Sequence, residues 1–435
     1  MKFIVFKNTV LLFVLIMISC GNVRKGEGMA SKENSNHLDE TLKQVQGDTN
    51  IVVGANQIEK YLPILEGKRV GVVANQTSVV FKGKDSLFWI DPETRETGFE
   101  KLVFRNTHLV DSLLSLKINI IKVFAPEHGF RGMADAGEIV KDGIDTKTQL
   151  PIISLYGNNK KPSKEQLRDL DIMVFDIQDV GARFYTYIST LHYVMEACAE
   201  NNIPLLILDR PNPNGHYVDG PVLEMEHKSF VGMHPIPVVH GITIGEYAQM
   251  INGEKWLANE VQCNLTVIPI ENYSHNSCYS LPINPSPNLP NDKAINLYPS
   301  LCFFEGTNVS AGRGTNKQFQ IFGSPFLNPE QFNFEFTTKP NEGAKYPKHE
   351  GKLCYGKDLT QFENLNALNL AWLIEAYNNT DKKSEFFNNF FVKLAGTKKL
   401  QQQIEQGLTE ERIKATWTEG LSQFKKTRQK YLLYP

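Results

Sequence analysis

From residue 51 onward, short apolar runs alternate with longer segments whose apolar residues recur at helical spacing. Strands with nearly continuous apolar sequence are buried on both faces, and strands that alternate with helices form parallel sheets. The pattern therefore predicts an α/β fold in which helices cover a parallel sheet. The expected strands are 68–74, 118–124, 151–155, 172–175, 205–208 and 265–270, and the expected helices are 55–66, 107–116, 163–170, 186–201 and 243–252.

The second part of the chain has a weaker pattern. Residues 281–290 contain four prolines, which exclude a regular helix. A glycine-rich loop is expected at 306–314, followed by a poorly patterned stretch to about residue 356 and three helical segments between 367 and 430. We place a domain boundary near residue 260, which gives a larger domain at 51–260 and a smaller, mixed α+β domain at 261–435.

The first residues have the pattern of an export signal. Lys2 and Lys7 form a short basic segment. The apolar run that follows, Val10 to Ile18, is too short for a transmembrane helix, and Ser19 and Cys20 come directly after it. A small residue before a cysteine resembles the lipobox of bacterial lipoproteins. We expect cleavage after residue 19, lipidation of Cys20 and a flexible tether at 20–50, and hence an exported, membrane-anchored lipoprotein facing the periplasm. An ordinary secretory signal peptide is the alternative.

Composition excludes several classes of protein. Lys and Arg total 46 against 48 Asp and Glu, so the basic surplus of a nucleic-acid-binding protein is missing. Hydrophobic residues make up 41% of the chain, which suffices for packed cores. Six cysteines in 435 residues are too few for a disulfide scaffold. The five beyond Cys20 have no metal-ligand spacing, and we expect buried thiols, with one disulfide as an alternative.

Polar residues follow each of the first five predicted strands after residue 51. Ligands bind outside the carboxyl ends of parallel strands, so these residues predict one shared crevice. The candidates are Asn75 after the first strand, Glu127, His128 and Arg131 after the second, Asp176, Asp179 and Arg183 after the fourth, and Asp209 and Arg210 after the fifth. The third strand leads into a tyrosine and a glycine.

The motifs that would indicate a cofactor or a nucleophilic serine are missing from the sequence. No G-x-G-x-x-G, P-loop or G-x-S-x-G motif is present. His128, Asp176 and Asp179 could ligate a metal, but no H-x-H or H-E-x-x-H motif supports this. We therefore predict neither a cofactor nor a metal.

Carboxylates are the remaining candidates. A pair of carboxyl groups, one of which keeps its proton, is the machinery of glycoside hydrolysis. Asp176 and Asp209 could instead accept backbone N–H bonds at strand ends or helix starts. Glu127 has no helix to cap, because it lies between Pro126 and His128 in a turn beyond a buried strand. It is the leading candidate.

Seven motifs and the C-terminal tetrapeptide resemble the bacterial exo-β-N-acetylmuramidase family typified by NamZ. The resemblance spans about residues 54–434, with the motifs in the family's order. They are A-P-E-H-G at 125–129, S-L-Y-G at 154–157, F-D-I-Q-D-V-G-A-R-F-Y-T-Y at 175–187, L-D-R-P-N-P at 208–213, H-G-I-T-I-G-E at 240–246, P-S-P-N-L-P at 285–290, E-G-T-N-V-S-A-G-R-G-T at 305–315 and Y-L-L-Y at 431–434.

The resemblance implies a peptidoglycan-recycling enzyme. Such enzymes release N-acetylmuramic acid (MurNAc) from the non-reducing end of peptidoglycan fragments such as MurNAc–GlcNAc. It also implies a Rossmann-like N-terminal domain and a smaller C-terminal domain, with the active site between them. The family's candidate catalytic acid corresponds to Glu127. Two residues depart from the family pattern: Ala311 replaces a glutamate and Gln76 replaces a histidine, which puts details of substrate binding in doubt.

The expected substrate suggests roles for further residues. Its lactyl carboxylate calls for an arginine, and Arg131, Arg183, Arg210 and Arg313 are candidates, with Arg183 and Arg313 preferred. Asp176 or Asp179 could be the second carboxylate, and Tyr185 could stabilise the oxocarbenium-like centre or orient the sugar. Asn288 and Asn308 could bind the N-acetyl group, and the remaining substrate-binding candidates are Asn75, His128, Asp209 and Glu305.

Two other functions remain open at this point. The protein could be a lipoprotein that binds muramyl fragments without cutting them, or an amidase or esterase that acts on the cell wall. The sequence leaves the oligomeric state undetermined.

Overall fold

The computed structural model describes residues 51–90, 97–132 and 142–435. The predicted signal peptide, Cys20 and the tether lie outside these residues. Within them, no helix has both the length and the apolar character needed to cross a bilayer.

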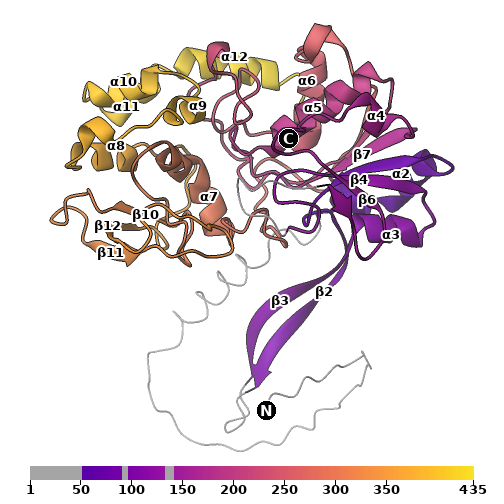
Figure 1. The fold of residues 1–435 in the computed structure, drawn as a ribbon, viewed down its shortest axis with the longest axis horizontal. Coiled ribbons are helices and arrows are strands. Elements are labelled where there is room, and N and C mark those ends of the chain that lie inside the picture. Colours follow the sequence, from indigo (N-terminus) through magenta and orange to yellow (C-terminus); the bar gives the residue numbers. More distant parts are fainter. Residues whose placement is uncertain (1–50, 91–96, 133–141) are drawn as a thin grey trace, which may run out of the picture. The chain divides into compact units, whose positions relative to one another are not determined.

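A seven-stranded sheet forms the first part of the chain and confirms the predicted α/β class (Figure 1). Its strand order is β5-β6-β4-β1-β7-β8-β9, and each neighbouring pair is parallel except β5 with β6. The central strands are buried at every position. The strands are β1 (Val70–Ala74), β4 (Ile120–Ala125), β5 (Gly143–Ile144), β6 (Pro151–Ser154), β7 (Ile172–Asp176), β8 (Leu205–Leu208) and β9 (Leu265–Ile268).

Helices cover both faces of this sheet. One face packs Val70 and Val72 against α2 and α3, and the other packs Met173 and Phe175 against α4, α5 and α6. Because neighbouring residues of a strand point to opposite faces, strands with apolar residues at every position are what this arrangement requires. The helices are α2 (Ile58–Leu65), α3 (Leu109–Ser115), α4 (Lys164–Leu167), α5 (Tyr187–Glu200) and α6 (Ile244–Gly253).

The start of α6 agrees with the capping box expected from the sequence. The Thr243 hydroxyl accepts the backbone N–H of Glu246, and the Glu246 side chain accepts the backbone N–H of Thr243. Both groups would otherwise be unpaired donors at the helix N-terminus.

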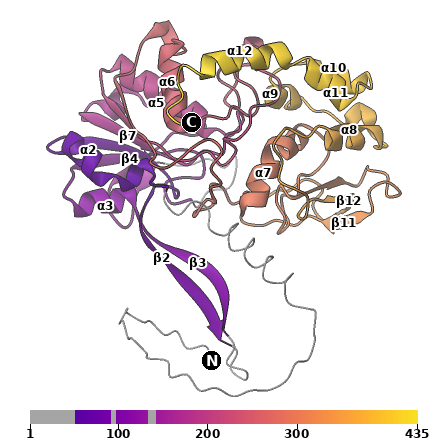
Figure 2. The same ribbon diagram turned by 180° about the vertical axis from the view of Figure 1, so that it is seen from behind.

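A long hairpin after β1 was not anticipated. Strands β2 (Val79–Ile90) and β3 (Thr97–His108) pair antiparallel as a two-stranded sheet, and Figure 2 shows them extending away from the large sheet. Strand β3 includes the first residues of the helix predicted at 107–116, which begins only at Leu109, where the His108 side chain accepts the N–H of Val110.

The second part of the chain contains its own small antiparallel sheet, in the order β10-β12-β11. Its strands are only four to six residues long. Strand β10 is buried throughout, whereas β11 and β12 are partly exposed, so the sequence shows no clear common pattern. Five helices instead of the three expected segments follow. The elements are α7 (Asp292–Leu301), β10 (Ile321–Ser324), β11 (Phe334–Thr337), β12 (Leu353–Asp358), α8 (Ala371–Asn378), α9 (Phe391–Ala395), α10 (Lys399–Glu405), α11 (Glu410–Ala415) and α12 (Thr418–Arg428).

The end of the chain returns to the large sheet. The Tyr434 hydroxyl donates to Oδ2 of Asp209 at 2.7 Å and accepts the N–H of Ile270 at 2.9 Å. Strand β9 lies beyond the boundary expected near residue 260 and still pairs with β8. The C-terminal segment therefore stabilises the sheet's outer edge.

The five cysteines beyond residue 20 are all free thiols. Four are buried, among them Cys198 of α5, as expected for apolar packing, and Cys278 is exposed.

Replacing Tyr434 by phenylalanine should lower the free energy of unfolding by about 1–3 kcal/mol, because a buried carboxylate and a backbone N–H each lose a partner. Urea denaturation measures the change. Tyr346→Phe is the matched control, since Tyr346 is 92% exposed. Equal stability of the two variants would contradict the role given to Tyr434.

Candidate active site

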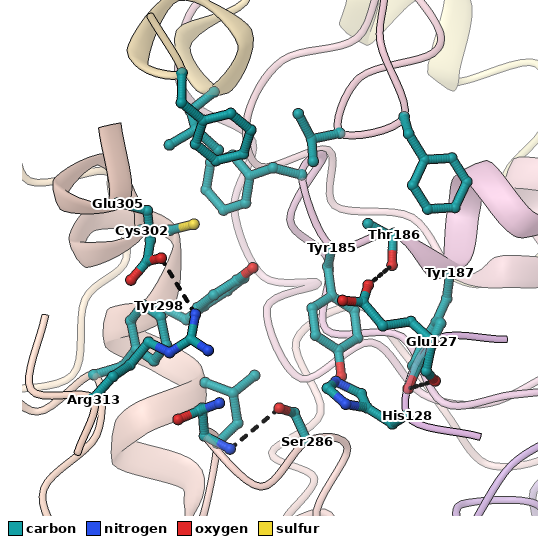
Figure 3. Close-up of a pocket in the computed structure, with 18 of the residues that line it drawn as sticks. Glu127, His128, Tyr185, Thr186, Tyr187, Ser286, Tyr298, Cys302, Glu305 and Arg313 are labelled. Atoms are coloured by element: carbon teal, nitrogen blue, oxygen red, sulfur yellow. Dashed lines mark hydrogen bonds and ion pairs between the residues drawn. The ribbon is translucent and has the colours of Figure 1, made fainter. Parts of the chain in front are cut away.

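A cavity of about 340 Å³ lies beyond the carboxyl ends of β4, β6 and β7. One wall comes from the loops after these strands and the other from the second part of the chain, as Figure 3 shows. Its lining residues are Glu127, His128, Tyr156, Phe184, Tyr185, Thr186, Tyr187, Phe230, Val231, Ser286, Asn288, Leu289, Tyr298, Cys302, Glu305, Arg313, Phe319, Phe390 and Leu394.

Glu127 projects into the cavity from a tight turn. The N–H of Gly129 bonds to the carbonyl of Pro126 at 3.0 Å, and His128 has a φ of 71°. This left-handed conformation is uncommon for a residue other than glycine and is frequent at functional sites. The Thr186 hydroxyl donates to Oε2 of Glu127 at 2.6 Å, so the carboxyl group is held in one orientation.

Tyrosines surround Glu127. Burial, and then the charge of Glu127, raise the pKa of Tyr156, so that this phenol remains a hydrogen-bond donor at neutral pH. Tyr185 and Tyr187 pack edge to face with ring centres 4.9 Å apart, and both hydroxyls bond to the carbonyl of Pro285. The proline-rich loop is thereby fixed against the sheet.

A second polar group lies across the cavity from Glu127 (Figure 3). Nη1 of Arg313 is 3.3 Å from Oε2 of Glu305, and each side chain is about one quarter exposed. Nη2 of Arg313 donates to the carbonyl of Gly343 at 3.3 Å, and Nδ2 of Asn288 donates to the same carbonyl at 2.6 Å. The cavity therefore has the carboxyl group of Glu127 at one side and the guanidinium of Arg313, paired with Glu305, at the other.

Lys348 fixes the loop that carries Glu305. Its Nζ donates to four backbone carbonyls, those of Phe304, Glu305, Thr307 and Val309, at 2.7–3.3 Å. Carbonyls left without partners in a buried loop are costly, and the lysine satisfies them together.

Six of the predicted site residues line the cavity: Glu127, His128, Tyr185, Asn288, Glu305 and Arg313. The other eight lie outside the lining, and most of them have partners that explain their burial.

Asp176 and Arg210 bind each other. The guanidinium donates to both oxygens of Asp176, from Nε at 2.6 Å and from Nη2 at 2.9 Å, and the two side chains are 0% and 3% exposed. Since β7 and β8 are neighbours in the sheet, opposite charges at their ends meet. The geometry gives this pair a structural role in place of the predicted catalytic and substrate-binding roles.

Asp209 supports helix α6 and the C-terminus. Its oxygens accept hydrogen bonds from the N–H of Gly245, the hydroxyl of Thr243 and the hydroxyl of Tyr434. Burial raises its pKa to about 6 despite these donors. This is the structural alternative that the sequence left open for Asp209.

Arg183 is completely buried and donates to backbone oxygens. Nη1 bonds to the carbonyls of Pro221 and Ile236, and Nη2 bonds to those of Leu394 and Ala395, at 2.7–2.8 Å. Burial lowers its pKa to about 9. The guanidinium therefore joins the two parts of the chain, and it is not placed to hold a substrate carboxylate.

Arg131 and two asparagines also lie outside the lining. Arg131 forms ion pairs with Asp111 at 3.3 Å and Asp145 at 2.8 Å. The Asn75 side chain accepts the N–H and the hydroxyl of Thr77. Asn308 uses its backbone oxygen to accept hydrogen bonds from Ser324 and His349.

Asp179 lies beneath the site, 5% exposed. Oδ2 accepts the N–H of Gly181 at 2.7 Å and is 3.8 Å from Nε2 of His240. Oδ1 has no hydrogen-bond partner, and burial raises the pKa of Asp179 to about 7. A buried carboxyl group with no cation bonded to it and one oxygen unpartnered is better suited to carrying a proton than to acting as an anion.

The sequence missed several lining residues. Tyr156, Thr186 and Tyr187 belong to the family motifs at 154–157 and 175–187. Thr186 and Tyr187 follow the candidate Tyr185, and Tyr156 follows the end of the third strand, so each had a signal in the sequence. Tyr298 and Phe319 gave none, because they lie on segments outside those motifs. Lys348 had no signal either, since it is an isolated lysine in an unpatterned stretch.

The two residues that depart from the family pattern, Gln76 and Ala311, both lie outside the cavity lining. Gln76 Nε2 donates to the carbonyls of Asn284 and Pro285 at 3.3 and 3.2 Å, which links the end of β1 to the proline-rich loop. Ala311 is 2% exposed and lies outside the lining.

Comparison with known proteins gives concordant matches. Family models described as exo-β-N-acetylmuramidase NamZ match residues 70–293 with the N-terminal model and residues 296–434 with the C-terminal model. The peptidoglycan β-N-acetylmuramidase NamZ of Bacillus subtilis (strain 168) is 35% identical over 447 residues, covering 98% of this chain and 100% of the relative.

Two solved structures are similar, both DUF1343 family proteins from Bacteroides fragilis NCTC 9343. One is 44% identical with a TM-score of 0.77, and the match covers 89% of this chain and 99% of the solved chain. The other is 27% identical with a TM-score of 0.70, and the match covers 88% of this chain and 99% of the solved chain.

The pKa of Asp179 predicts a pH-dependent stability. The folded chain keeps this proton up to about pH 7, whereas the ordinary pKa is 3.8, so folding takes up a proton between these values. Stability should therefore fall as the pH rises through this window, by up to about 1.4 kcal/mol per pH unit. Asp179→Asn should remove this component, so that the wild type loses more stability than the variant between pH 4 and 7 in urea titrations. Parallel curves for the two proteins would contradict the assignment.

Proposed function

The chain belongs to the exo-β-N-acetylmuramidase NamZ family, and from this premise we propose that it releases MurNAc from the non-reducing end of peptidoglycan fragments such as MurNAc–GlcNAc. The observation that carries this function is the pairing, across one cavity, of an oriented glutamate with an arginine. An anionic sugar can be held by the arginine while the glutamate acts on its glycosidic bond.

Glu127 is the general acid in this proposal. It lines the cavity, and the Thr186 hydroxyl donates to one of its oxygens at 2.6 Å, which orients the carboxyl group. Proton transfer to the leaving oxygen by a positioned carboxylic acid is the first step of glycoside hydrolysis. Asp176 has no part in this step, because both its oxygens bond to Arg210.

Arg313 is the proposed ligand of the lactyl carboxylate. Of the four arginines considered, Arg183 and Arg210 are buried in structural contacts and Arg131 is paired with two aspartates. Arg313 lines the cavity, and Nη1 and Nη2 each donate one hydrogen bond. A guanidinium has five N–H donors, so further donors remain for a ligand.

Asn288 is the proposed ligand of the N-acetyl group. Its Nδ2 is bonded to Gly343, while Oδ1 is buried without a partner at the cavity wall. An acetamido N–H would satisfy this oxygen. Aromatic rings of Tyr185, Tyr298 and Phe319 supply apolar surface for the sugar ring.

We further propose an exported lipoprotein that is attached to a membrane through Cys20 and faces the periplasm. The supporting observations are the two lysines, the short apolar run and the serine–cysteine pair at its end. Mass spectrometry of the protein from membranes would test for an acylated Cys20.

Glu127→Gln should reduce release of MurNAc from MurNAc–GlcNAc by about 10²–10⁴-fold, since the amide cannot donate the acidic proton. Free MurNAc is measured by chromatography. Glu66→Gln, at an exposed helix end, is the control and should retain full activity. Lack of release by the wild type would favour a binding lipoprotein, and release of peptide or acyl groups would favour an amidase or esterase.

Arg313→Met should lower kcat/KM for a chromogenic MurNAc glycoside by about 10–100-fold, corresponding to one charged hydrogen-bonded contact of roughly 1.5–3 kcal/mol. The same variant should change activity on the matching GlcNAc glycoside much less, because that sugar lacks the lactyl carboxylate. Arg412→Met, at an exposed position of α11, is the control. An equal loss of kcat/KM on both glycosides would show that Arg313 does not bind the lactyl carboxylate.

A further inference from the structure

A cluster of two carboxylates and an imidazole lies on the loop between β8 and α6. Glu224 precedes the short 3-10 helix η2 (Met225–His227), which carries Glu226 and His227. One ligand atom from each of the three side chains lies within 4.8 Å of the others. None of the three lines the cavity.

The imidazole of His227 is aimed at both carboxylates. Its Nε2 is 3.5 Å from Oε1 of Glu226 and 4.0 Å from Oε2 of Glu224. The His227 side chain is only 10% exposed, and Nε2 is buried without a hydrogen-bond partner. A buried nitrogen that faces two carboxylate oxygens and forms a hydrogen bond to neither leaves room for a ligand that joins all three groups.

Glu224 is held in place from outside the cluster. Its backbone N–H donates to the carbonyl of Gly396 at 2.8 Å, and its other oxygen, Oε1, accepts a hydrogen bond from Lys399 at 2.7 Å. These contacts fix the carboxylate and leave Oε2 facing His227.

From this geometry we propose that Glu224, Glu226 and His227 form a binding site for a divalent cation of the zinc type. Imidazole nitrogen and carboxylate oxygen are both ligands that Zn²⁺ accepts in proteins, at about 2.0–2.2 Å. A tetrahedral ion would bring its ligands to roughly 3.4 Å from one another, which is close to the 3.5 Å already present between His227 and Glu226. Mg²⁺ and Ca²⁺ prefer sites built only from oxygen.

The site is connected to the cavity through a short loop. Ser229 and Gly232 exchange two backbone hydrogen bonds at 2.9 and 3.0 Å, and the two residues between them, Phe230 and Val231, line the cavity. An ion bound at Glu224, Glu226 and His227 would therefore hold the segment that positions part of the cavity wall.

Zinc binding to the full chain tests the proposal directly. The protein is stripped with a chelator and titrated with Zn²⁺ in competition with a chromophoric chelator, and with Co²⁺ followed by its visible absorption. We expect one equivalent to bind to the wild type at concentrations at which Mg²⁺ does not compete. Glu226→Gln and His227→Gln should weaken this binding by more than the roughly 10–100-fold that loss of an outer contact causes.

Glu260→Gln is the matched control, because Glu226 and Glu260 are both 70% exposed. It should bind zinc as the wild type does, which separates the site from adsorption at other histidines and thiols. Glu226→Gln changes an exposed side chain, so a result remains available if His227→Gln fails to fold. The proposal is wrong if the wild type binds no equivalent, or if the variants bind as tightly as the control.

The effect on the cavity is a second readout and rests on the proposed function. Zinc should change KM for the MurNAc glycoside in the wild type and in Glu260→Gln, but not in Glu226→Gln. If the protein releases no MurNAc, the binding titration still decides whether the metal site exists. If the protein does release MurNAc, a KM that stays unchanged when zinc binds at this site would overturn the link to the cavity.

Discussion

The buried guanidinium of Arg183 is the interaction on which the arrangement of the cavity depends. It joins two carbonyls of the loops after β8 to two carbonyls at the end of α9. Burying a cation without a carboxylate partner costs free energy. Burial accordingly lowers the pKa of Arg183 to about 9. Four carbonyl dipoles at 2.7–2.8 Å compensate the charge, and they do so only while both parts of the chain stay together. The next residues in sequence, from Phe184 to Tyr187, form the cavity wall.

The same principle, cationic groups satisfied by backbone oxygens, recurs at the other wall. Lys348 binds four carbonyls of the loop that leads from Glu305 to Val309, while Arg313 and Asn288 share the carbonyl of Gly343. These loops contain little regular structure, so their backbone oxygens lack the partners that a helix or sheet provides. Long cationic side chains supply those partners and hold the loops in one conformation. The proposed substrate-binding groups on these loops are thereby held in one arrangement before any ligand binds.

Sequence reasoning predicted the large sheet well and the site only in part. Strands such as β7 and β8 were recognisable because every position is buried, and the polar residues after them did gather at one end of the sheet. The sequence did not show which of these polar residues pair with each other. Asp176 and Arg210 were each predicted to act in the site, but adjacent strands bring them into contact with each other. Lys348 acts on residues about 40 positions away, a relation that no local pattern contains. The strands β10 to β12 are short and differ in burial, with β10 buried throughout and β11 and β12 partly exposed, so the sequence shows no strong periodicity there.

The two charged groups of the far wall explain how such a site could prefer an anionic sugar without attracting every anion. Glu305 neutralises Arg313 at 3.3 Å when no ligand is bound, so the long-range attraction of a bare guanidinium is largely removed. An incoming carboxylate must therefore gain its binding energy from short, directed hydrogen bonds to the donors that Glu305 and Gly343 leave unused. Such bonds form only if the sugar's ring position fits the aromatic walls and presents the lactyl group at the right place. The glycosidic bond would then lie toward Glu127 on the opposite side, so that recognition of the lactyl group and positioning of the acid are consequences of the same fit.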